Sequence, residues 1–517
     1  MATDSGNMDN RQTSAAWRYH DGTKHSFLTV RNNPHYLDWG NMPLPFKIYP
    51  TIEPIRLPRE VPQTGVDAFD AIAGNVRPDR PAVPGIKDLS QLLYFSAGIT
   101  RQRKYPGGEI YFRAAACTGA LYEIELYLVC ADIPALSSGV YHFAPAEFGL
   151  RGLRSGDYRS ALFEATADHP AVARAPLTIL CTGTYWRNAW KYQARTYRHF
   201  GWDNGTLLAN MLAMCSALAL PAEVLVGFRD DLVNRLLDLD IDREVAFSMV
   251  AIGNTAESPS PDHPPIGPLH LEHLPYSRRE VDYPLMREMH AASSLATSDE
   301  VRALREMRTP DAIAEPKNDL IPLQPLPPED TPRRPIERVI LRRGSTRHFA
   351  REPISFAQLS TMLHRSTGGF SADFHNPFSA QLNHMYLIVN AVEGLPSGAY
   401  YFHRDRRALE LLKQGEFRSD AAYLGLEQEL PGDAAADVFF LADLNSVLQA
   451  YGNRGYRAVQ LEAGMLGGKL YLAAYALGLG ATGLTFYDDD VVNFFSPHAA
   501  GKSAIFLTCL GKSAKRR

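Results

Sequence analysis

Hydrophobic positions along the chain fall into short apolar runs and two long apolar stretches. The runs at 124–130, 177–182 and 247–252 have the length and apolar character of buried strands. The stretches at 203–219 and 461–477 are long enough for buried helices. Together these patterns predict an α+β fold, in which helices surround a mostly antiparallel sheet.

The same series of elements occurs twice along the chain. The motif Ser-Gly-x-Tyr-x-Phe at 138–143 resembles the segment at 397–402, an offset of 259 residues. One constant offset over many positions indicates a duplicated domain. We expect the two copies to pack as a pseudo-twofold dimer within one chain, because a fused dimer keeps its interface. Further pairs at this offset are Tyr192 with Tyr451, Arg195 with Arg454, Arg198 with Arg457, and Asp230-Asp231 with Asp489-Asp490.

The two copies differ in length near their beginnings. Ser96-Ala-Gly98 matches Ser366-Thr-Gly368 at an offset of 270, so the first copy carries about eleven extra residues near 101–111. The segment 254–335 holds 15 of the 36 prolines, which predicts a surface linker, with one helix over 285–308. We therefore expect four parts: an extension at 1–60, a domain at 61–253, the linker at 254–335, and a second domain at 336–517.

Composition narrows the classes of partner. The net charge is −4, and this lack of a basic excess argues against nucleic acid and anionic lipid as partners. The five cysteines form no CxxC pair, which favours a reducing compartment.

The N-terminus lacks an apolar signal core and no stretch suits a membrane span, so we expect a cytoplasmic protein. His263, His270 and His273 lack zinc-ligand spacing, and we expect no metal.

Several motifs resemble those of one enzyme family. Residues 342–349, RRGSTRHF, resemble the arginine-serine-arginine element of the FMN-dependent nitroreductase fold. Residues 112–127, FRAAACTGALYEIELY, resemble an element of the SagB-type dehydrogenases, the azoline oxidases within that fold. Residues 190–198, WKYQARTYR, resemble another element of this subfamily, and 451–457 repeat it. The fold class expected is therefore two tandem nitroreductase-like domains.

The resemblance implies a flavin site shared between the two copies. In the family, one subunit supplies the phosphate-binding arginines, the glycine turn and the C-terminal cations, and the other supplies the small-residue loop and the Lys-Tyr pair. The matching cofactor-binding residues are Arg342, Arg343, Ser345, Arg347, Ala116, Cys117, Thr118, Gly119, Gly483, Leu484, Lys512, Lys515 and Arg516. The matching catalytic residues, implicated in proton removal, are Lys191 and Tyr192.

The residue types suit this chemistry. Arginine offers bidentate donors to a phosphate, and small residues let the backbone approach a flat ring. The copies are complementary: 72–77 lacks the arginines of 342–347, and Ala450 stands where the first copy has Lys191. We therefore expect one FMN per chain. The simpler alternatives are a solvated basic helix end at 342–347, a surface lysine at 191, a core tyrosine at 192, and a packing role for Cys117.

Three functional hypotheses follow. The first is a SagB-type FMN-dependent dehydrogenase that oxidises a small molecule or a modified peptide, such as a peptide azoline, by two electrons. The second is an NAD(P)H-dependent reductase of nitro or quinone compounds. The third is a non-catalytic scaffold that binds flavin or peptide within a biosynthetic complex, motivated by Ala116-Cys117 and Glu123, which depart from the family motif. Further homo-oligomerisation stays open.

Overall fold

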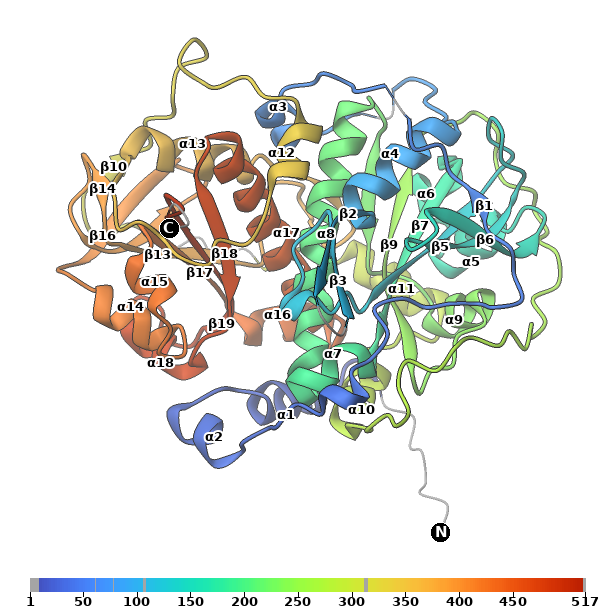
Figure 1. The fold of residues 1–517 in the computed structure, drawn as a ribbon, viewed down its shortest axis with the longest axis horizontal. Helices are drawn as coiled ribbons and strands as arrows, with labels where there is room; N and C mark the ends of the chain where they lie inside the picture. Colours follow the sequence, from blue (N-terminus) through green and yellow to red (C-terminus); the bar gives the residue numbers. More distant parts are fainter. Residues whose placement is uncertain (1–8, 61, 78, 106–107, 311–314, 515–517) are drawn as a thin grey trace.

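Two β-sheets lie on opposite sides of a central pair of long helices (Figure 1). The computed structural model describes residues 9–60, 62–77, 79–105, 108–310 and 315–514. The central helices are α8 (Thr196–Ala217) from the first half of the chain and α17 (Arg454–Ala476) from the second. This arrangement confirms the predicted α+β class with a sheet in each of two tandem halves.

Both sheets have the same strand order, and all pairings within that shared order are antiparallel. In the first half the order is β1 (Ile55–Arg56), β6 (Gly149–Ser155), β5 (Gly139–Ala144), β4 (Ile124–Cys130), β7 (Leu177–Thr184), β9 (Glu244–Ile252) and β8 (Ala222–Leu225). In the second half it is β10 (Leu320–Pro322), β16 (Ala408–Gln414), β15 (Gly398–His403), β13 (His384–Val389), β17 (Ala436–Ala442), β19 (Ser503–Gly511) and β18 (Gly480–Leu484).

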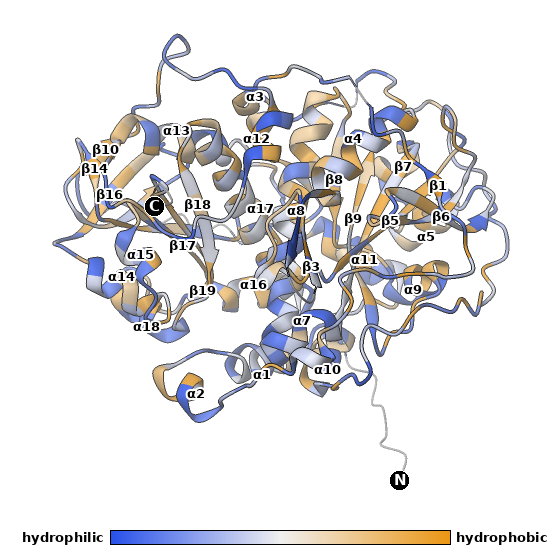
Figure 2. Ribbon diagram, viewed as in Figure 1, coloured by the Kyte–Doolittle hydropathy of each residue, from blue (hydrophilic) through white to orange (hydrophobic). Residues whose placement is uncertain are grey.

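The strands and the central helices form the hydrophobic core. Strands β4, β7 and β17 are buried along their whole length, as continuous apolar runs require. Figure 2 shows hydrophobic residues along the strands of both sheets and hydrophilic residues on outer loops and outer helices. The other helices of the two halves are α3 (Ala68–Ala73), α4 (Ile86–Ala97), α5 (Arg159–Ala165), α6 (Pro170–Arg174), α7 (Tyr185–Tyr192), α9 (Asp230–Leu237), α12 (Ile336–Arg342), α13 (Phe356–Ser366), α14 (Arg418–Leu424), α15 (Glu429–Asp433), α16 (Leu444–Tyr451) and α18 (Asp488–Phe495).

The first sheet receives one strand from the second half. Strand β12 (Ser371–Ala372) pairs in parallel with β8, with Ser371 opposite Glu223 and Ala372 opposite Val224. Two further sheets have two strands each: β11 (Ile354–Ser355) with β14 (Val392–Glu393), and the hairpin of β2 (Ile99–Tyr105) with β3 (Gly108–Arg113). The contribution of β12 ties the two halves together through backbone hydrogen bonds.

The central helices cross at glycines. A Cβ atom added to Gly205 would lie 2.6 Å from the Cα atom of Gly464, and one added to Gly464 would lie 2.5 Å from the carbonyl oxygen of Trp202. Any larger residue would therefore push the helices apart. Beside this crossing the indole N–H of Trp202 donates to the Gln460 side chain at 2.7 Å.

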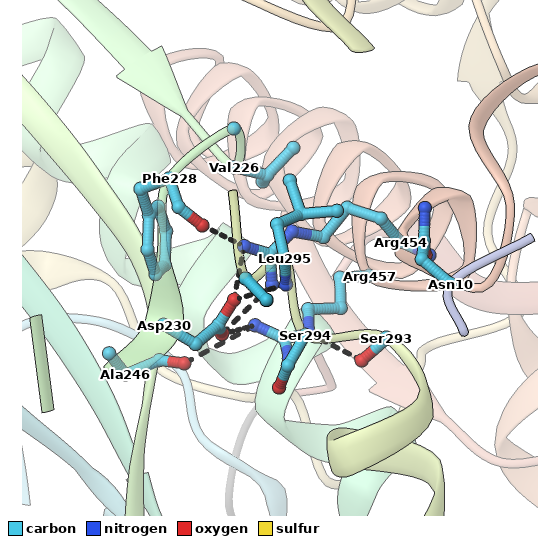
Figure 3. Close-up of polar contacts among 12 residues, drawn as sticks. Asn10, Val226, Phe228, Asp230, Ala246, Ser293, Ser294, Leu295, Arg454 and Arg457 are labelled. Atoms are coloured by element: carbon cyan, nitrogen blue, oxygen red, sulfur yellow. Dashed lines mark hydrogen bonds and ion pairs between the residues drawn. The ribbon is translucent and has the colours of Figure 1, made fainter. Parts of the chain in front are cut away.

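Two buried ion-pair clusters join the halves reciprocally. Asp230, at the start of α9, contacts Arg454 at 2.7 Å and Arg457 at 2.8 Å on α17 (Figure 3). Asp488, at the start of α18, contacts Arg195 at 3.0 Å and Arg198 at 2.6 Å. Each half thus supplies one aspartate to a pair of arginines from the other half. This reciprocal arrangement follows the expected pseudo-twofold relation between the halves.

The N-terminal segment packs across the same interface. It contains α1 (Ser14–Gly22), α2 (Phe27–Asn32) and a 3-10 turn at Trp39–Asn41. The ring of Tyr19 on α1 is fully buried and makes edge contacts with Tyr197 and Tyr456, one from each central helix. This part of the extension is therefore a component of the interface.

The prediction of one helix over 285–308 was wrong. The structure has two helices, α10 (Pro284–Ala292) and α11 (Ser298–Glu306). The chain leaves the helical path between them because the Leu295 N–H donates to the Asp230 carboxylate at 2.9 Å. Thr297 then starts α11 through a capping box with Glu300.

The central helices also begin earlier than expected. They start at Thr196 and Arg454, so the repeated Tyr-Arg motifs form their first turns.

None of the helices in the described ranges combines the length and the apolar character that a membrane crossing needs.

Candidate functional site

A cavity of about 640 Å³ lies between the two halves, and residues of both halves line it. It brings together most of the side chains singled out in the sequence. From the first half these are Ala116, Cys117, Thr118, Gly119, Lys191 and Tyr192; from the second half they are Arg343, Ser345, Arg347, Gly483 and Leu484.

The loop after β3 forms one wall of the cavity. A short 3-10 turn spans Thr118–Ala120, and Gly119 within it has φ +63°. A Cβ atom at Gly119 would lie 2.9 Å from the Tyr192 hydroxyl oxygen, so only glycine satisfies both the backbone and the space. The carbonyl oxygen of Ala116 accepts a hydrogen bond from the Thr206 hydroxyl at 2.6 Å, which fixes the loop on α8.

Asp203 on α8 also holds this loop. Its carboxylate accepts the Thr118 N–H and the Thr118 hydroxyl, both at 2.9 Å. Cys117 and Glu123 lie beside it, and the side-chain ligand atoms of the three residues are all within 4.8 Å of one another. Burial and then the Glu123 carboxylate raise the pKa of Asp203 well above its ordinary value. Burial likewise raises the pKa of the Cys117 thiol, which therefore stays protonated.

The arginine segment follows α12. The Arg343 side chain crosses to the first half and donates to the carbonyl oxygens of Ala114 (2.9 Å) and Arg113 (3.2 Å). Arg347 is exposed, and among the described residues its side chain makes no hydrogen bond or ion pair. Its guanidinium is therefore available to a ligand in the cavity. Ser345 approaches the Tyr471 hydroxyl at 3.4 Å.

The turn at Gly483 forms the opposite wall. Its N–H donates to the Tyr471 hydroxyl. A Cβ atom at Gly483 would lie 3.0 Å from the Phe506 ring, so a side chain there would need that ring to shift. Within the described residues, the buried hydroxyl oxygen of Thr485 has no hydrogen-bond partner, although this residue lines the cavity. Such an orphaned polar atom is satisfied when a ligand supplies the partner.

Lys191 and Tyr192 end helix α7 at the cavity. Burial, and then the positive charge of Arg347, lower the pKa of Lys191. Burial raises the pKa of Tyr192, so its hydroxyl stays protonated at neutral pH. The Lys191 nitrogen lies 5.3 Å from the centre of the Tyr192 ring. This pair offers a lysine with an increased neutral fraction beside a protonated hydroxyl.

Two expected site residues, Arg342 and Lys512, do not line the cavity. Arg342 is exposed at the last position of α12 and is absent from the lining of the cavity. Lys512 does not line it either, and it pairs with Glu352 at 3.3 Å. Lys515 and Arg516 lie outside the described residues.

Comparison with known proteins found one solved structure that matches this chain over almost all of its residues. Residues 340–508 match the family model described as "Nitroreductase: Nitroreductase family". The crystal structure of a nitroreductase-like protein from Anabaena variabilis is similar with a TM-score of 0.77 and 28% identity, over 97% of this chain and 100% of that chain. The chain has the nitroreductase fold.

Two further similarities are more limited. A nitroreductase-like protein of Methanocaldococcus jannaschii is 28% identical over 166 residues, which is 30% of this chain and 81% of that protein. A structure of the Escherichia coli microcin synthetase McbBCD complex with a truncated pro-MccB17 matches at 18% identity with a TM-score of 0.30, over 45% of this chain and 82% of that chain. The second match is too weak to bear on function.

The nitroreductase fold of this chain has a second inter-half position, related to the cavity by the pseudo-twofold. There the backbone of β12 occupies the edge of β8, and the Asp373 carboxylate accepts the N–H groups of Val226 (3.0 Å) and Gly227 (2.7 Å). Beside this edge, a cavity of about 120 Å³ is lined by first-half residues such as Arg77 and Glu223, together with Ser371 of β12. The two inter-half positions therefore differ, because β12 and Asp373 cover the strand edge at the second position.

Sequence reasoning missed several residues of the larger cavity in this nitroreductase fold. Asp203, Thr206 and Tyr471 line it from the central helices, and Arg101 and Arg103 line it from the hairpin. One signal was available, since Asp203 is an acidic residue within an otherwise apolar helical stretch, where a partner is needed. The hairpin arginines gave a second signal, because they fall in the segment that only the first copy has.

Proposed function

We propose that this chain is an FMN-dependent oxidoreductase of the SagB-type dehydrogenase kind, with one composite site between its halves. One observation carries the proposal: the cavity of about 640 Å³ joins the arginine segment of the second half to the small-residue loop and the Lys-Tyr pair of the first. Strand β12 and Asp373, which cover the strand edge at the second inter-half position, support one FMN per chain.

The cavity residues fit a flavin. Arg343, Ser345 and Arg347 would hold the phosphate, since guanidinium groups suit phosphate oxygens. Gly119 and Gly483 leave room for a flat ring, and the orphaned Thr485 hydroxyl could take a hydrogen bond from it. When bound, FMN supplies a two-electron acceptor.

The substrate side of the proposal rests on Lys191 and Tyr192. The lowered pKa of Lys191 increases its neutral form, which can take a proton from a substrate carbon. Tyr192 keeps its proton and can donate a hydrogen bond that orients the substrate. A peptide azoline is the substrate class that the SagB-type resemblance suggests. The five free cysteines also fit the cytoplasmic location expected from the sequence.

The first test is the visible spectrum of the purified protein, with flavin released by heat and quantified. We expect about one FMN per chain. Arg347→Ala should weaken FMN binding by about tenfold or more, because it removes a charge-assisted contact without removing a protein partner. Arg342→Ala is the matched control: this neighbouring arginine does not line the cavity, so FMN content should stay unchanged. A protein that neither contains nor takes up FMN would refute the proposal.

A second test separates chemistry from cofactor binding. Lys191→Met should keep the FMN content and lower the rate of azoline oxidation by about 10²–10⁴-fold, the usual range for loss of a general base. The measurement is single-turnover reduction of the bound flavin by a peptide azoline. Rapid bleaching by NADH or NADPH, with no reaction of the azoline, would instead favour the reductase hypothesis. Bound FMN that neither donor reduces would favour the scaffold.

A further inference from the structure

The hairpin β2–β3 belongs to the first half alone. It spans Ile99–Tyr105 and Gly108–Arg113, and within the described part of the chain its two strands pair only with each other. It accounts for the extra residues near 101–111 that the second half lacks. Among the described residues, the second half has no hairpin that corresponds to it.

The two faces of the hairpin differ in how their charges are matched. Arg101 is opposite Phe112 in the register, and both residues line the cavity together with Arg103. Residues two apart on a strand share a face, so the two arginines project on the same side. Both guanidinium groups lie within 6 Å of the Phe112 ring centre, at 5.9 and 5.8 Å.

On the opposite face the basic residue is neutralised. Lys104 pairs with Glu109 at 3.1 Å, and Glu109 also accepts hydrogen bonds from Gln102 and Tyr111. Within the described residues, Arg101 and Arg103 make no comparable ion pair. Two like charges on one strand face are unfavourable unless an anion lies near them.

The cavity as a whole carries more positive charge than one flavin phosphate can neutralise. A phosphate monoester carries about −1.5 to −2 at neutral pH. The acidic residue in the lining, Asp203, has a raised pKa, and His25 and His199 have lowered pKa values and stay neutral. The arginines of the lining are Arg101, Arg103, Arg113, Arg343 and Arg347.

We propose that Arg101 and Arg103 bind an oxyanion, carboxylate or phosphate, on the substrate or co-substrate that enters the cavity beside the flavin. This subsite rests on the proposed function, because it is defined relative to bound FMN. The hairpin is exposed and belongs to the half opposite the phosphate-binding segment, so its arginines are placed to select a second ligand. Phe112 between them offers a flat apolar surface to the same ligand.

The test uses the full-length protein loaded with FMN. Benzoate and inorganic phosphate are titrated separately, and the absorbance change of the bound flavin gives each dissociation constant. Benzamide, the neutral counterpart of benzoate, is the ligand control. Arg101→Gln and Arg103→Gln should each weaken binding of the recognised anion by about tenfold, since each removes a charge-assisted contact. Lys104→Gln, on the outer face of the same hairpin, should change neither binding nor FMN content.

Each outcome decides the proposal. Binding of benzoate alone identifies a carboxylate ligand, and binding of phosphate alone identifies a phosphate. Failure of both anions to bind, equal weakening in Lys104→Gln, or equal binding of benzamide would overturn the subsite. Loss of FMN from the Arg101 and Arg103 variants would also overturn it, because the arginines would then serve the flavin phosphate. If the unmodified protein binds no FMN, the proposed function fails separately, and calorimetry with benzoate and the same variants decides the subsite.

Discussion

At the scale of single residues, Asp203 is held in an unusual protonation state beside the cavity. It lies with Glu123 and Cys117 in a buried cluster, and the two carboxyl groups are close enough to disfavour double ionisation. Burial and the neighbouring carboxylate raise the pKa of Asp203. The folded protein therefore keeps a proton that the unfolded chain releases near the ordinary aspartate pKa, so this residue's contribution to stability is lost as pH rises.

This residue gives a prediction about pH. Glu123→Gln removes the neighbouring negative charge, so Asp203 should ionise at lower cost. At pH 4 the variant and the unmodified protein should have similar thermal unfolding midpoints. Toward pH 8 the free energy of unfolding of the variant should rise relative to that of the unmodified protein. The expected rise is about 1.4 kcal/mol for each tenfold decrease in the proton affinity of folded Asp203. The exposed Glu416→Gln provides the control and should show no trend. A difference that does not change with pH would contradict the prediction.

At the scale of secondary-structure elements, one of the buried positions at which the equivalent helices α8 and α17 differ carries a lysine. Lys469 on α17 donates to the Gly369 carbonyl oxygen at 3.2 Å and is 3% exposed, and burial lowers its pKa to about 7. The position related to it by the offset of 259 on α8 is Asn210, a neutral residue that donates to the Phe95 carbonyl oxygen at 2.9 Å. The second helix thus carries a buried lysine that the first avoids.

Replacing this lysine should change how stability depends on pH. Since the folded pKa of Lys469 lies below its unfolded value near 10.4, the unfolded chain binds more protons between these values, and stability rises with pH across that window. Lys469→Met lacks this contribution. Its stability relative to the unmodified protein should therefore fall by on the order of 2–3 kcal/mol from pH 6 to pH 9. Urea unfolding at both values measures this, with the exposed Lys317→Met as control; parallel curves for Lys469→Met would refute it.

At the scale of the whole molecule, two buried ion clusters connect the halves. Arg454 and Arg457 are fully buried, and both pair with the single carboxylate of Asp230. Their guanidinium groups also reach the backbone oxygens of Phe228, Ala246 and His290 (Figure 3 shows the first two). Loss of the single carboxylate would leave two buried charges without a counter-ion, which is among the more costly changes a protein interior can undergo.

Asp230→Asn should therefore lower the free energy of unfolding by about 3–5 kcal/mol. The adjacent Asp231→Asn changes an exposed carboxylate that pairs with Arg229 and Arg235 at the surface, so it should cost at most about 1 kcal/mol. Urea midpoints of the two variants give the comparison. Equal midpoints would show that the cluster adds nothing beyond a surface pair.

The lengths of the apolar runs were enough to predict the α+β class, and the constant offset of 259 residues was enough to predict two similar halves. The acidic pairs at 230–231 and 489–490 and the Tyr-Arg motifs were found as repeats, but not as partners of one another. That pairing depends on how the two halves pack against each other. In addition, helix capping alone accounts for an aspartate at the start of α9 and of α18, so these residues gave no reason to expect an ion pair.

The site was predictable only to the level of segments. Of the adjacent Arg342 and Arg343, only the second lines the cavity, because α12 ends at Arg342 and the chain turns there. Sequence alone does not set that helix end to within one residue. The break between α10 and α11 was missed for a related reason: a carboxylate from α9, distant in sequence, takes the backbone N–H of Leu295.

Strand β12, which the second half contributes to the first sheet, is synthesised long after the rest of that sheet. Strand β12 follows β8 by about 145 residues, so at roughly 5–20 residues per second the ribosome needs on the order of ten seconds or more to deliver it. Until then β8 is an open edge that another chain could pair with. The first half therefore keeps an unpaired β8 edge until β12 has been synthesised.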